Sequence, residues 1–338
     1  MRALRTATLA AFPILFATRT APAGADEGGD NGPITIRVAT PFAPGQILAV
    51  TADKFKEILE QKYPGQFQVT VAKSVLNEQA IDPAMQNCDP AQRVADIAVT
   101  GGQPIADWAP AYGFVNGPYV LKDFSHFQAV WRSDLGVAAA DLIKTNGNVV
   151  VLEPVYRGFR QFTSNKPIHG PADFVGLKLR LPAIPDWVAV WSSLGATIVQ
   201  VPLNSLYDAL KSGRAEASEG DLTQITSLKL YQVQTDLTLT SHLVGFGLPL
   251  ANACFLQNEL NEGQRQKVLH AMEDASDFAT KTIIADEPSL IAQLQAAGMT
   301  VVTPDAASIR AAAKPAIDHL FATEWTVTTW AAVLKLAN

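Results

Sequence analysis

The stretch YRGFRQFTSN (residues 156–165), followed by GLKLRLP (residues 176–182), decides how the chain folds around its site. Each segment places an arginine, Arg160 or Arg180, beside residues that alternate as in a β-strand. The residues between the segments predict a loop and a short helical turn. Two neighbouring strands would then bring two guanidinium groups to one crevice, where their planar donors match a carboxylate. The alternative is that both arginines are solvated ion-pair partners at the surface.

Outward from this stretch, strand-like and helical patterns alternate. In the first third we expect strands at 34–39, 67–72 and 95–100, with helices at 47–63 and 78–87, the second broken at Pro83. This β-α-β-α-β order is typical of a parallel sheet with helices on both faces, an α/β fold.

Ligands of such sheets bind beyond the carboxyl ends of the strands. Thr40, Thr100 and Gly101 follow two of these strands, so we expect them at one crevice. The alternative for each is ordinary loop chemistry.

The second half predicts further elements. Helices are expected at 186–194, from Asn204 to Ser212, from Asn261 to about Ala292 with an interruption near Pro288, and at 306–320. Strands are expected at 149–152, 197–201, 237–242, 249–255 and 298–302, with a short strand that ends near Glu219 and Gly220.

The N-terminus has the pattern of a secretory signal peptide. A positive segment, residues 1–5, precedes a short apolar run at 7–17, and Ala23-Gly24-Ala25 fits a cleavage site after Ala25. The apolar run is too short to span a bilayer, and no later stretch is long and apolar enough. We therefore expect residues 1–25 to be removed and the mature protein to be periplasmic or secreted, without direct membrane insertion.

Composition and motifs narrow the function classes. The chain has 338 residues, enough for two domains, and a net charge of −6 argues against a nucleic-acid partner. Its five histidines are scattered and show no metal-ligand spacing, so we expect no metal and no cofactor. The sequence contains no nucleophile elbow, zinc-protease motif or P-loop. Cys88 and Cys254 could pair in an exported protein, but two distant cysteines do not establish a disulfide.

Four segments also carry a family resemblance. They are GFRQFTSNKPI (158–168), GLKLRLP, LGATIVQVPLNSLYDALKSGRAEASEG (194–220) and KLYQVQTDLTLTSH (229–242). In this order they resemble the substrate-binding proteins of TRAP transporters, the tripartite ATP-independent periplasmic carriers of bacteria, specifically the dicarboxylate-binding type. The likeness runs from about Ile34 to near the C-terminus and is densest between Gly158 and His242.

The resemblance implies a two-lobed periplasmic binding protein fold, with a long helix spanning both lobes. We expect lobe I to comprise 34–156 and 244–285, and lobe II to comprise 157–243 and 286–320. A C-terminal helical segment would cover 321–338.

The resemblance also implies roles for individual residues. Arg180 matches the carboxylate clamp of the family, and Arg160 matches its second arginine. Glu219 matches the acid that braces the arginines, and His242 matches a polar residue near the hinge. Leu203 falls where a hydrophobic side chain walls the pocket.

Some positions depart from the family pattern. Gly220 stands where an asparagine often follows the acid, so an amide contact to the ligand would be lost. Asp221 replaces a common proline and adds a negative charge of undetermined role. Trp187 could wall the pocket or lie in the core, whereas Trp191, four residues on, is expected in the core.

The function implied is capture of a small-molecule carboxylate, an organic acid, by hinge closure and its delivery to the TRAP membrane permease subunits. The alternatives are an ABC-type or sensor solute-binding protein, and a periplasmic enzyme using Arg160, Arg180, Glu219 and His242 for acid–base chemistry. We expect Arg180→Ala to abolish binding and leave the fold intact, because an exposed cleft arginine contributes little to stability.

Overall fold

The structure is a computed structural model that describes residues 32–337, and the expected signal peptide lies outside them. The strands are β1 (Ile34–Thr40), β2 (Phe67–Lys73), β3 (Ile97–Thr100), β4 (Val149–Val151), β5 (Val155–Ser164), β6 (Lys178–Leu181), β7 (Thr197–Gln200), β8 (Ala217–Gly220), β9 (Asp236–Asn252) and β10 (Thr300–Val302).

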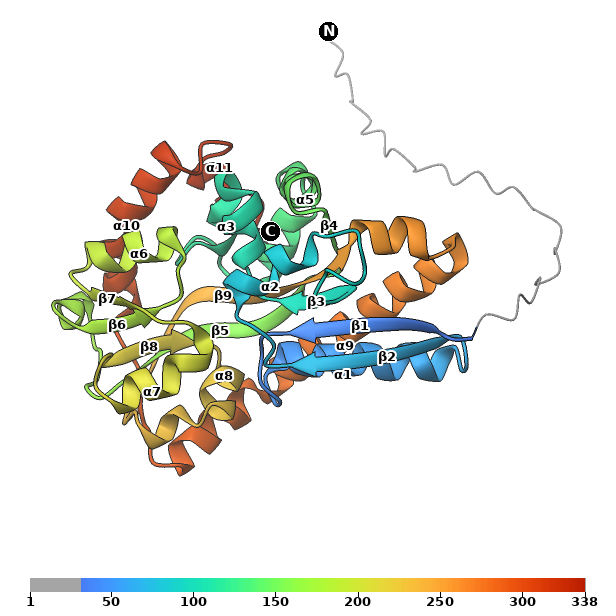
Figure 1. Cartoon of the computed structure of the whole chain (residues 1–338). Helices are drawn as coiled ribbons and strands as arrows, with labels where there is room; N and C mark the ends of the chain where they lie inside the picture. Colours follow the sequence, from blue (N-terminus) through green and yellow to red (C-terminus); the bar gives the residue numbers. More distant parts are fainter. Residues whose placement is uncertain (1–31, 338) are drawn as a thin grey trace, which may run out of the picture. The chain divides into compact units, whose positions relative to one another are not determined.

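The α-helices surround the strands (Figure 1). They are α1 (Ile47–Lys62), α2 (Glu78–Ile81), α3 (Gln103–Trp108), α4 (Phe124–Trp131), α5 (Asp134–Gly147), α6 (Pro185–Ser193), α7 (Leu206–Lys211), α8 (Leu222–Ser227), α9 (Glu262–Ala296), α10 (Ala306–Thr323) and α11 (Trp330–Leu334). Shorter helical turns are η1 (Pro83–Met85), η2 (Pro110–Asn116), η3 (Pro171–Phe174), η4 (Leu203–Ser205), η5 (Leu230–Gln232) and η6 (Phe255–Glu259).

The first helix shows how the sequence forms these elements. The buried side chains of α1 include Leu48, Ala52, Phe55 and Leu59, which recur at a spacing of three or four residues and so form one apolar face. This face packs on β1, β2 and β3. The helix ends at Tyr63, directly before a proline and a glycine.

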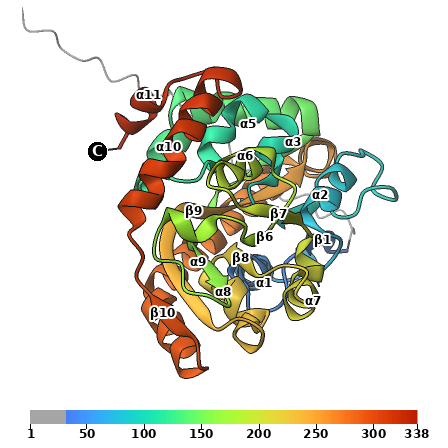
Figure 2. The same ribbon diagram turned by 90° about the vertical axis from the view of Figure 1, so that its left-hand side faces the viewer.

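The strands are arranged in the order β2-β1-β3-β9-β5-β8-β6-β7. The first three strands form a parallel group, as the β-α-β-α-β pattern predicts. β9 joins this group to the second one: its end at 248–252 pairs with β3 and β4, and 236–247 pairs with β5 and β10. Figure 2 shows the second group, with α6, α7 and α8 around β6, β7 and β8.

The prediction of separate strands at 237–242 and 249–255 was wrong, because β9 is continuous over 17 residues. Gly245 and Gly247, which look like breaks in the sequence, meet close neighbours instead. A Cβ on Gly245 would lie 2.5 Å from the carbonyl oxygen of Gly158, and one on Gly247 would lie 2.4 Å from Leu48 Cδ2. These glycines permit tight packing inside a strand.

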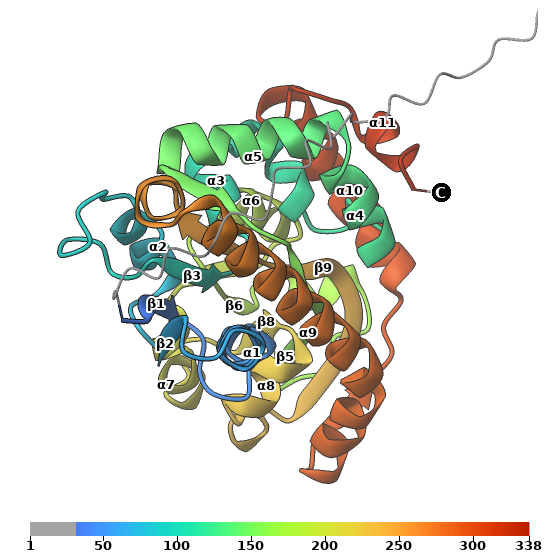
Figure 3. The ribbon, with the colours of Figure 1, turned by 90° about the vertical axis from the view of Figure 1, so that its right-hand side faces the viewer.

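The expected interruption of the long helix near Pro288 was also wrong. α9 runs unbroken for 35 residues with Pro288 inside it, although a proline removes one helical hydrogen bond. The preceding residue anchors the helix at this point, because Glu287 Oε1 accepts a hydrogen bond from the amide of Phe159 at 3.0 Å. α9 packs on α1, the helix that covers the first strand group, and on β5 and α8 of the second (Figure 3).

Among the smaller predictions, some are confirmed and one is wrong. The break at Pro83 is confirmed, since α2 ends at Ile81 and η1 begins at Pro83. The helix expected from Asn204 begins at Leu206 instead, because the preceding residues form the turn η4. Trp191 is fully buried in the core, as predicted. None of the helices between residues 32 and 337 is long and apolar enough to cross a bilayer.

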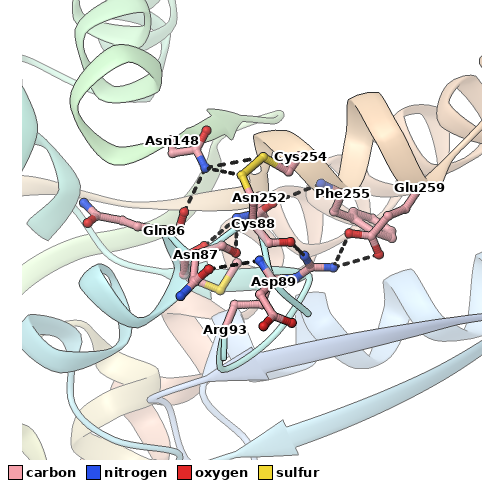
Figure 4. Close-up of a disulfide and its surroundings, with 11 residues drawn as sticks. Gln86, Asn87, Cys88, Asp89, Arg93, Asn148, Asn252, Cys254, Phe255 and Glu259 are labelled. Atoms are coloured by element: carbon pink, nitrogen blue, oxygen red, sulfur yellow. Dashed lines mark hydrogen bonds and ion pairs between the residues drawn. A yellow bond between two sulfur atoms is a disulfide. The ribbon is translucent and has the colours of Figure 1, made fainter. Parts of the chain in front are cut away.

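The two cysteines, whose pairing the sequence left open, form a disulfide (Figure 4). Cys88 lies in the loop before β3, and Cys254 follows β9. The amide of Asn252 donates to the carbonyl oxygens of Met85 at 2.7 Å and Asn87 at 3.1 Å. Arg93, in the same loop, pairs with Glu259 at 2.8 Å. The disulfide therefore belongs to a set of contacts that fastens this loop to the end of β9.

Replacing both cysteines, as Cys88→Ser with Cys254→Ser, should lower the free energy of unfolding by about 2–5 kcal/mol. The cross-link spans 166 residues of sequence, so it restricts the unfolded chain strongly. Urea denaturation of the oxidised protein and the double variant measures the difference. The reduced wild-type protein is the control and should match the variant; equal stability of all three would contradict the prediction.

Candidate ligand-binding site

A cavity beside the strand groups contains the two predicted arginines. Arg157, Arg160 and Arg180 line it, and its wall is completed by polar and apolar side chains from both halves of the chain. In this conformation its volume is about 20 Å³, enough for about one or two water molecules.

The sequence suggested that the two arginines lie on neighbouring strands, but the structure shows that they do not. Arg160 is on β5 and Arg180 is on β6, but β8 lies between these strands and pairs with both. The crossover from β5 to β6 leaves room for β8, which returns later in the chain. As a result β8 brings Glu219 into the space between the two arginines.

Arg160 and Glu219 form a buried ion pair. Arg160 Nε donates to Glu219 Oε2, and Arg160 Nη2 donates to Glu219 Oε1 at 2.8 Å. The two residues are 5% and 1% exposed. Burial alone would raise the pKa of Glu219, but the charge and hydrogen bonds of Arg160, with a hydrogen bond from His242, hold that pKa well below its usual range. Glu219 is therefore ionised and braces Arg160.

His242 supports this pair from β9. Its Nε2 lies 3.5 Å from Glu219 Oε2, and its Nδ1 lies 2.8 Å from the hydroxyl of Thr240. Burial lowers the pKa of His242, although Glu219 opposes the shift. A neutral imidazole at this position contacts Glu219 and does not line the cavity that the structure describes.

Arg157 has its own acid. Its Nη2 donates to Asp221 Oδ2 at 2.9 Å, and its guanidinium lies 4.5 Å from the ring centre of Phe42. Asp221 also caps α8 by accepting a hydrogen bond from the amide of Gln224. Asp221, whose role the sequence left undetermined, thus neutralises a third arginine.

Arg180 differs from the other two arginines. Its Nε donates to the carbonyl oxygen of Val201 at 2.7 Å, and it forms no ion pair with any residue that the structure describes. The residue is 2% exposed, so the expectation of an exposed cleft arginine was wrong. Burial lowers its pKa to about 10, which leaves the guanidinium cationic at neutral pH. The cavity therefore contains a buried positive charge that lacks a counter-ion from residues 32–337.

Trp187 and Leu203, two further predicted residues, line the cavity. Trp187 is on α6, and its indole Nε1 donates to the carbonyl oxygen of Asn116 at 2.6 Å. Its ring lies 5.1 Å from the Arg160 guanidinium, a cation–π distance. The sequence allowed Trp187 to wall the pocket or to lie in the core. Both interpretations describe part of its environment, because the side chain is buried and also lines the cavity.

The other predicted residues lie behind the lining. The hydroxyl of Thr40 donates to the carbonyl oxygen of Val99 at 2.8 Å, and Thr100 is fully buried at the end of β3. Gly101 is next to the lining residue Gly102. Gly220 makes room for a neighbour: a Cβ there would lie 2.5 Å from Gln224 Nε2. Gln224 lines the cavity and brings an amide to it.

Sequence reasoning missed Arg157, although it lies in the opening stretch. In a regular strand, residues 157 and 160 would point to opposite faces. β5 is irregular, with register shifts between Tyr156 and Gly158 and between Arg160 and Phe162, and both arginines line the cavity. Gly158, with φ of +88°, is the signal that could have revealed this bulge.

Three further missed residues are polar side chains on short helices and turns. Glu78 begins α2, Gln103 begins α3, and Asn116 ends η2. None of them follows a periodic pattern, so the sequence contains no signal that would single them out. No group of His, Cys, Asp and Glu side chains within residues 32–337 could hold a metal ion.

Comparisons with known proteins agree with this fold. The family "Bacterial extracellular solute-binding protein, family 7", DctP, matches residues 38–324, and the chain belongs to this family, the solute-binding proteins of TRAP transport. The sialic acid-binding periplasmic protein SiaP of Vibrio cholerae is 26% identical over 84% of this chain and 88% of its own length. The 2,3-diketo-L-gulonate-binding periplasmic protein YiaO of Escherichia coli is 23% identical over 75% of this chain and 76% of its own length.

Solved structures show the same two-lobed α/β architecture. A TRAP periplasmic solute-binding protein from Roseobacter denitrificans, with bound L-galactonate, has a TM-score of 0.80 and 25% identity, and the match covers 90% of this chain and 99% of that one. One from Shewanella oneidensis, with bound succinate, has a TM-score of 0.83 and 20% identity, covering 90% and 100%. The expected two-lobed α/β fold is confirmed.

Glu219→Gln should lower the free energy of unfolding by about 3–5 kcal/mol at pH 7, because it leaves Arg160 as a buried cation without its carboxylate. Since the pKa of Glu219 is lower in the folded protein than its ordinary value of 4.5, the stabilisation is fully present above that value and decreases progressively as the pH falls below it toward the folded-state pKa. The stability difference between wild type and variant should therefore shrink as the pH falls from about 5 to about 3.

Urea denaturation at several pH values measures this difference. The control is Glu57→Gln, which changes an exposed carboxylate on α1 that pairs only with Lys54 among the described residues. A Glu219→Gln protein as stable as wild type at pH 7 would show that the pair does not stabilise the fold.

Proposed function

We propose that this protein is the extracytoplasmic solute-binding subunit of a TRAP transporter and that it captures an organic acid with Arg180 as the carboxylate clamp. The observation that carries this proposal is the buried, unpaired charge of Arg180. Its neighbours Arg160 and Arg157 already have carboxylate partners. Arg180 is the arginine left to receive a carboxylate from outside the chain.

The energetics of burial support this role. A buried charge without a partner is unfavourable, and a bound carboxylate would supply the missing counter-ion. Nε of Arg180 is held by Val201, so the guanidinium is already oriented before a ligand arrives. A preorganised donor gives tighter binding because less conformational freedom is lost on association.

The small cavity supports hinge closure. A volume of about 20 Å³ is far below the roughly 300 Å³ of a typical small-molecule site, so a ligand can enter only if the walls separate. The contact from Trp187 on α6 to Asn116 at the end of η2 joins the two sides of the cavity. We propose that it opens to admit the ligand and closes over it. The lobe boundaries at 156/157, 243/244 and 285/286 are part of this proposal.

Related proteins support the ligand class. The names and titles of several describe binding of sialic acid, 2,3-diketo-L-gulonate, L-galactonate or succinate, each of which carries a carboxylate. Family membership supports the remaining steps: export by the N-terminal signal peptide, residence in the periplasm, and delivery of the closed complex to the membrane permease subunits.

A periplasmic enzyme is a weaker alternative than another kind of solute-binding protein. Arg160, Arg180, Glu219 and His242 could supply acid–base chemistry, but Glu219 is locked to Arg160 and neither it nor His242 lines the cavity as described. Mass analysis after incubation with candidate acids separates the two cases, since a binding protein returns its ligand unchanged. An ABC-type or sensor protein would have a different partner. Genes for two integral membrane subunits next to this one would favour the TRAP assignment, and a gene for an ATPase would favour the ABC type.

Arg180→Ala should weaken carboxylate binding by at least about 30-fold, because truncating one partner of a buried ion pair typically costs about 2–5 kcal/mol. Arg180→Lys should lose a substantial part of the affinity, because it retains the charge and loses the planar fork. Calorimetry with succinate, L-galactonate and D-erythronate, after a thermal-shift screen, measures both effects.

Lys178→Ala is the matched control, because Lys178 lies on the same strand and is exposed to solvent. It should bind as wild type does. Wild-type affinity in the Arg180→Ala protein would refute the clamp, whereas a wild type that binds none of a broad set of organic acids would refute the proposed function as a whole.

A further inference from the structure

Of the charged side chains that line the cavity, two form ion pairs within the described part of the chain and two, Arg180 and Glu78, do not. Arg157 pairs with Asp221, and Arg160 pairs with Glu219. Arg180 has no acid, and Glu78, the remaining charged lining residue, forms no ion pair or hydrogen bond through its carboxylate with any described residue. Among residues 32–337, Arg180 and Glu78 are therefore the two lining charges without an ion-pair partner, although their opposite charges attract each other at longer range.

The two unpartnered groups make different demands. Arg180 requires an acceptor with a negative charge, which a carboxylate provides. Glu78, when ionised, can only accept hydrogen bonds, so the part of a ligand beside it must donate. A second carboxylate in this position would face like charge, which is unfavourable in a site largely shielded from water.

The surroundings of Glu78 decide which donor fits. A Cβ on Gly101 would lie 2.1 Å from Glu78 Oε1 and 3.0 Å from Arg157 Nη1, so a carboxylate and a guanidinium flank the same backbone position. A ligand ammonium there would meet the Arg157 cation. A hydroxyl suits both neighbours, because it can donate to the carboxylate and accept from the guanidinium.

Side-chain amides extend the same pattern. Gln103, Asn116 and Gln224 line the cavity, and each amide offers both donors and an acceptor. The Gln103 amide is held in place, because its Nε2 donates to Asp107 at 2.8 Å. Gln224 occupies space that a side chain at Gly220 would fill. The sequence suggested that an amide contact is lost at Gly220. Gln224 on α8 thus supplies an amide in its place.

We infer that the ligand is a hydroxylated monocarboxylate, with its carboxylate on Arg180 and its hydroxyl groups toward Glu78 and the amides, and that Glu78 selects against dicarboxylates. This inference rests on the proposed function and narrows it. It differs from the expectation drawn from the dicarboxylate-binding type of the family.

Calorimetry with acids matched in length tests the inference. D-erythronate and succinate share a four-carbon skeleton, and L-galactonate and galactarate share one of six carbons; L-threonine supplies an ammonium beside a hydroxyl. At least one hydroxy monocarboxylate should bind about tenfold or more tightly than the dicarboxylate of its length and than L-threonine. Tighter binding of either dicarboxylate, or of L-threonine, overturns the inference and leaves the proposed function intact.

The variant Glu78→Gln assigns the selectivity to one side chain, because it removes the charge and keeps nearly the same size. It should reduce the preference for the hydroxy acid over its matched dicarboxylate by about tenfold, with Arg180 unchanged. Glu57→Gln is the control for the loss of an acid elsewhere and should keep the wild-type ratio. An unchanged ratio in Glu78→Gln overturns the role of Glu78, whereas failure of every acid to bind wild type overturns the proposed function itself.

Discussion

The buried ion pair between Arg160 and Glu219 is the interaction on which the site depends. Both groups are almost completely removed from water, a position that is tolerable only because each satisfies the other. The pair fixes the guanidinium of Arg160 and directs both oxygens of Glu219 toward Arg160. Glu219 on Arg160 and Asp221 on Arg157 together determine which of the three arginines is available to a ligand. The paired charges hold the site in shape, and the unpaired charge gives it its chemistry.

The order of the strands makes this pairing possible. β8 arrives late in the sequence and inserts between β5 and β6, so an acid from one segment separates two arginines from another. β9 then runs from the second strand group into the first without a break, and α9 packs on β5 of the second group and on α1, the helix that covers the first. The continuous strand and helix connect the two sides of the cavity, while the ligand-facing residues come from the loops and short helices around it.

Much of the fold could be predicted from the sequence, because strand alternation and helical spacing report local burial. The parallel β1, β2 and β3 group and the helix α1 follow directly from such patterns. Glycine and proline misled the analysis where packing overrides local preference: Gly245 and Gly247 lie inside a strand, and Pro288 lies inside a helix. Their neighbours in space, which no local pattern reveals, hold these segments in regular structure.

The site was only partly predictable for a related reason. Arg160 and Arg180 lie in strand-like motifs, whereas the presence of Arg157 in the cavity accompanies a bulge in β5 and Glu78 lies on a short helix without periodicity. Arg180 is buried, and the carbonyl oxygen that accepts its hydrogen bond belongs to Val201, in another segment of the chain. Residue spacing alone reveals neither the bulge in β5 nor the burial of Arg180.

The disulfide between Cys88 and Cys254 has a consequence for when the site is completed. Such bonds form in oxidising compartments and are rare in the reducing cytosol. The loop that it fastens follows α2, the helix that begins with Glu78. A newly synthesised chain would therefore lack this fastening until it has left the cytosol. With the export proposed above, the cross-link would make final assembly of one wall of the site follow secretion.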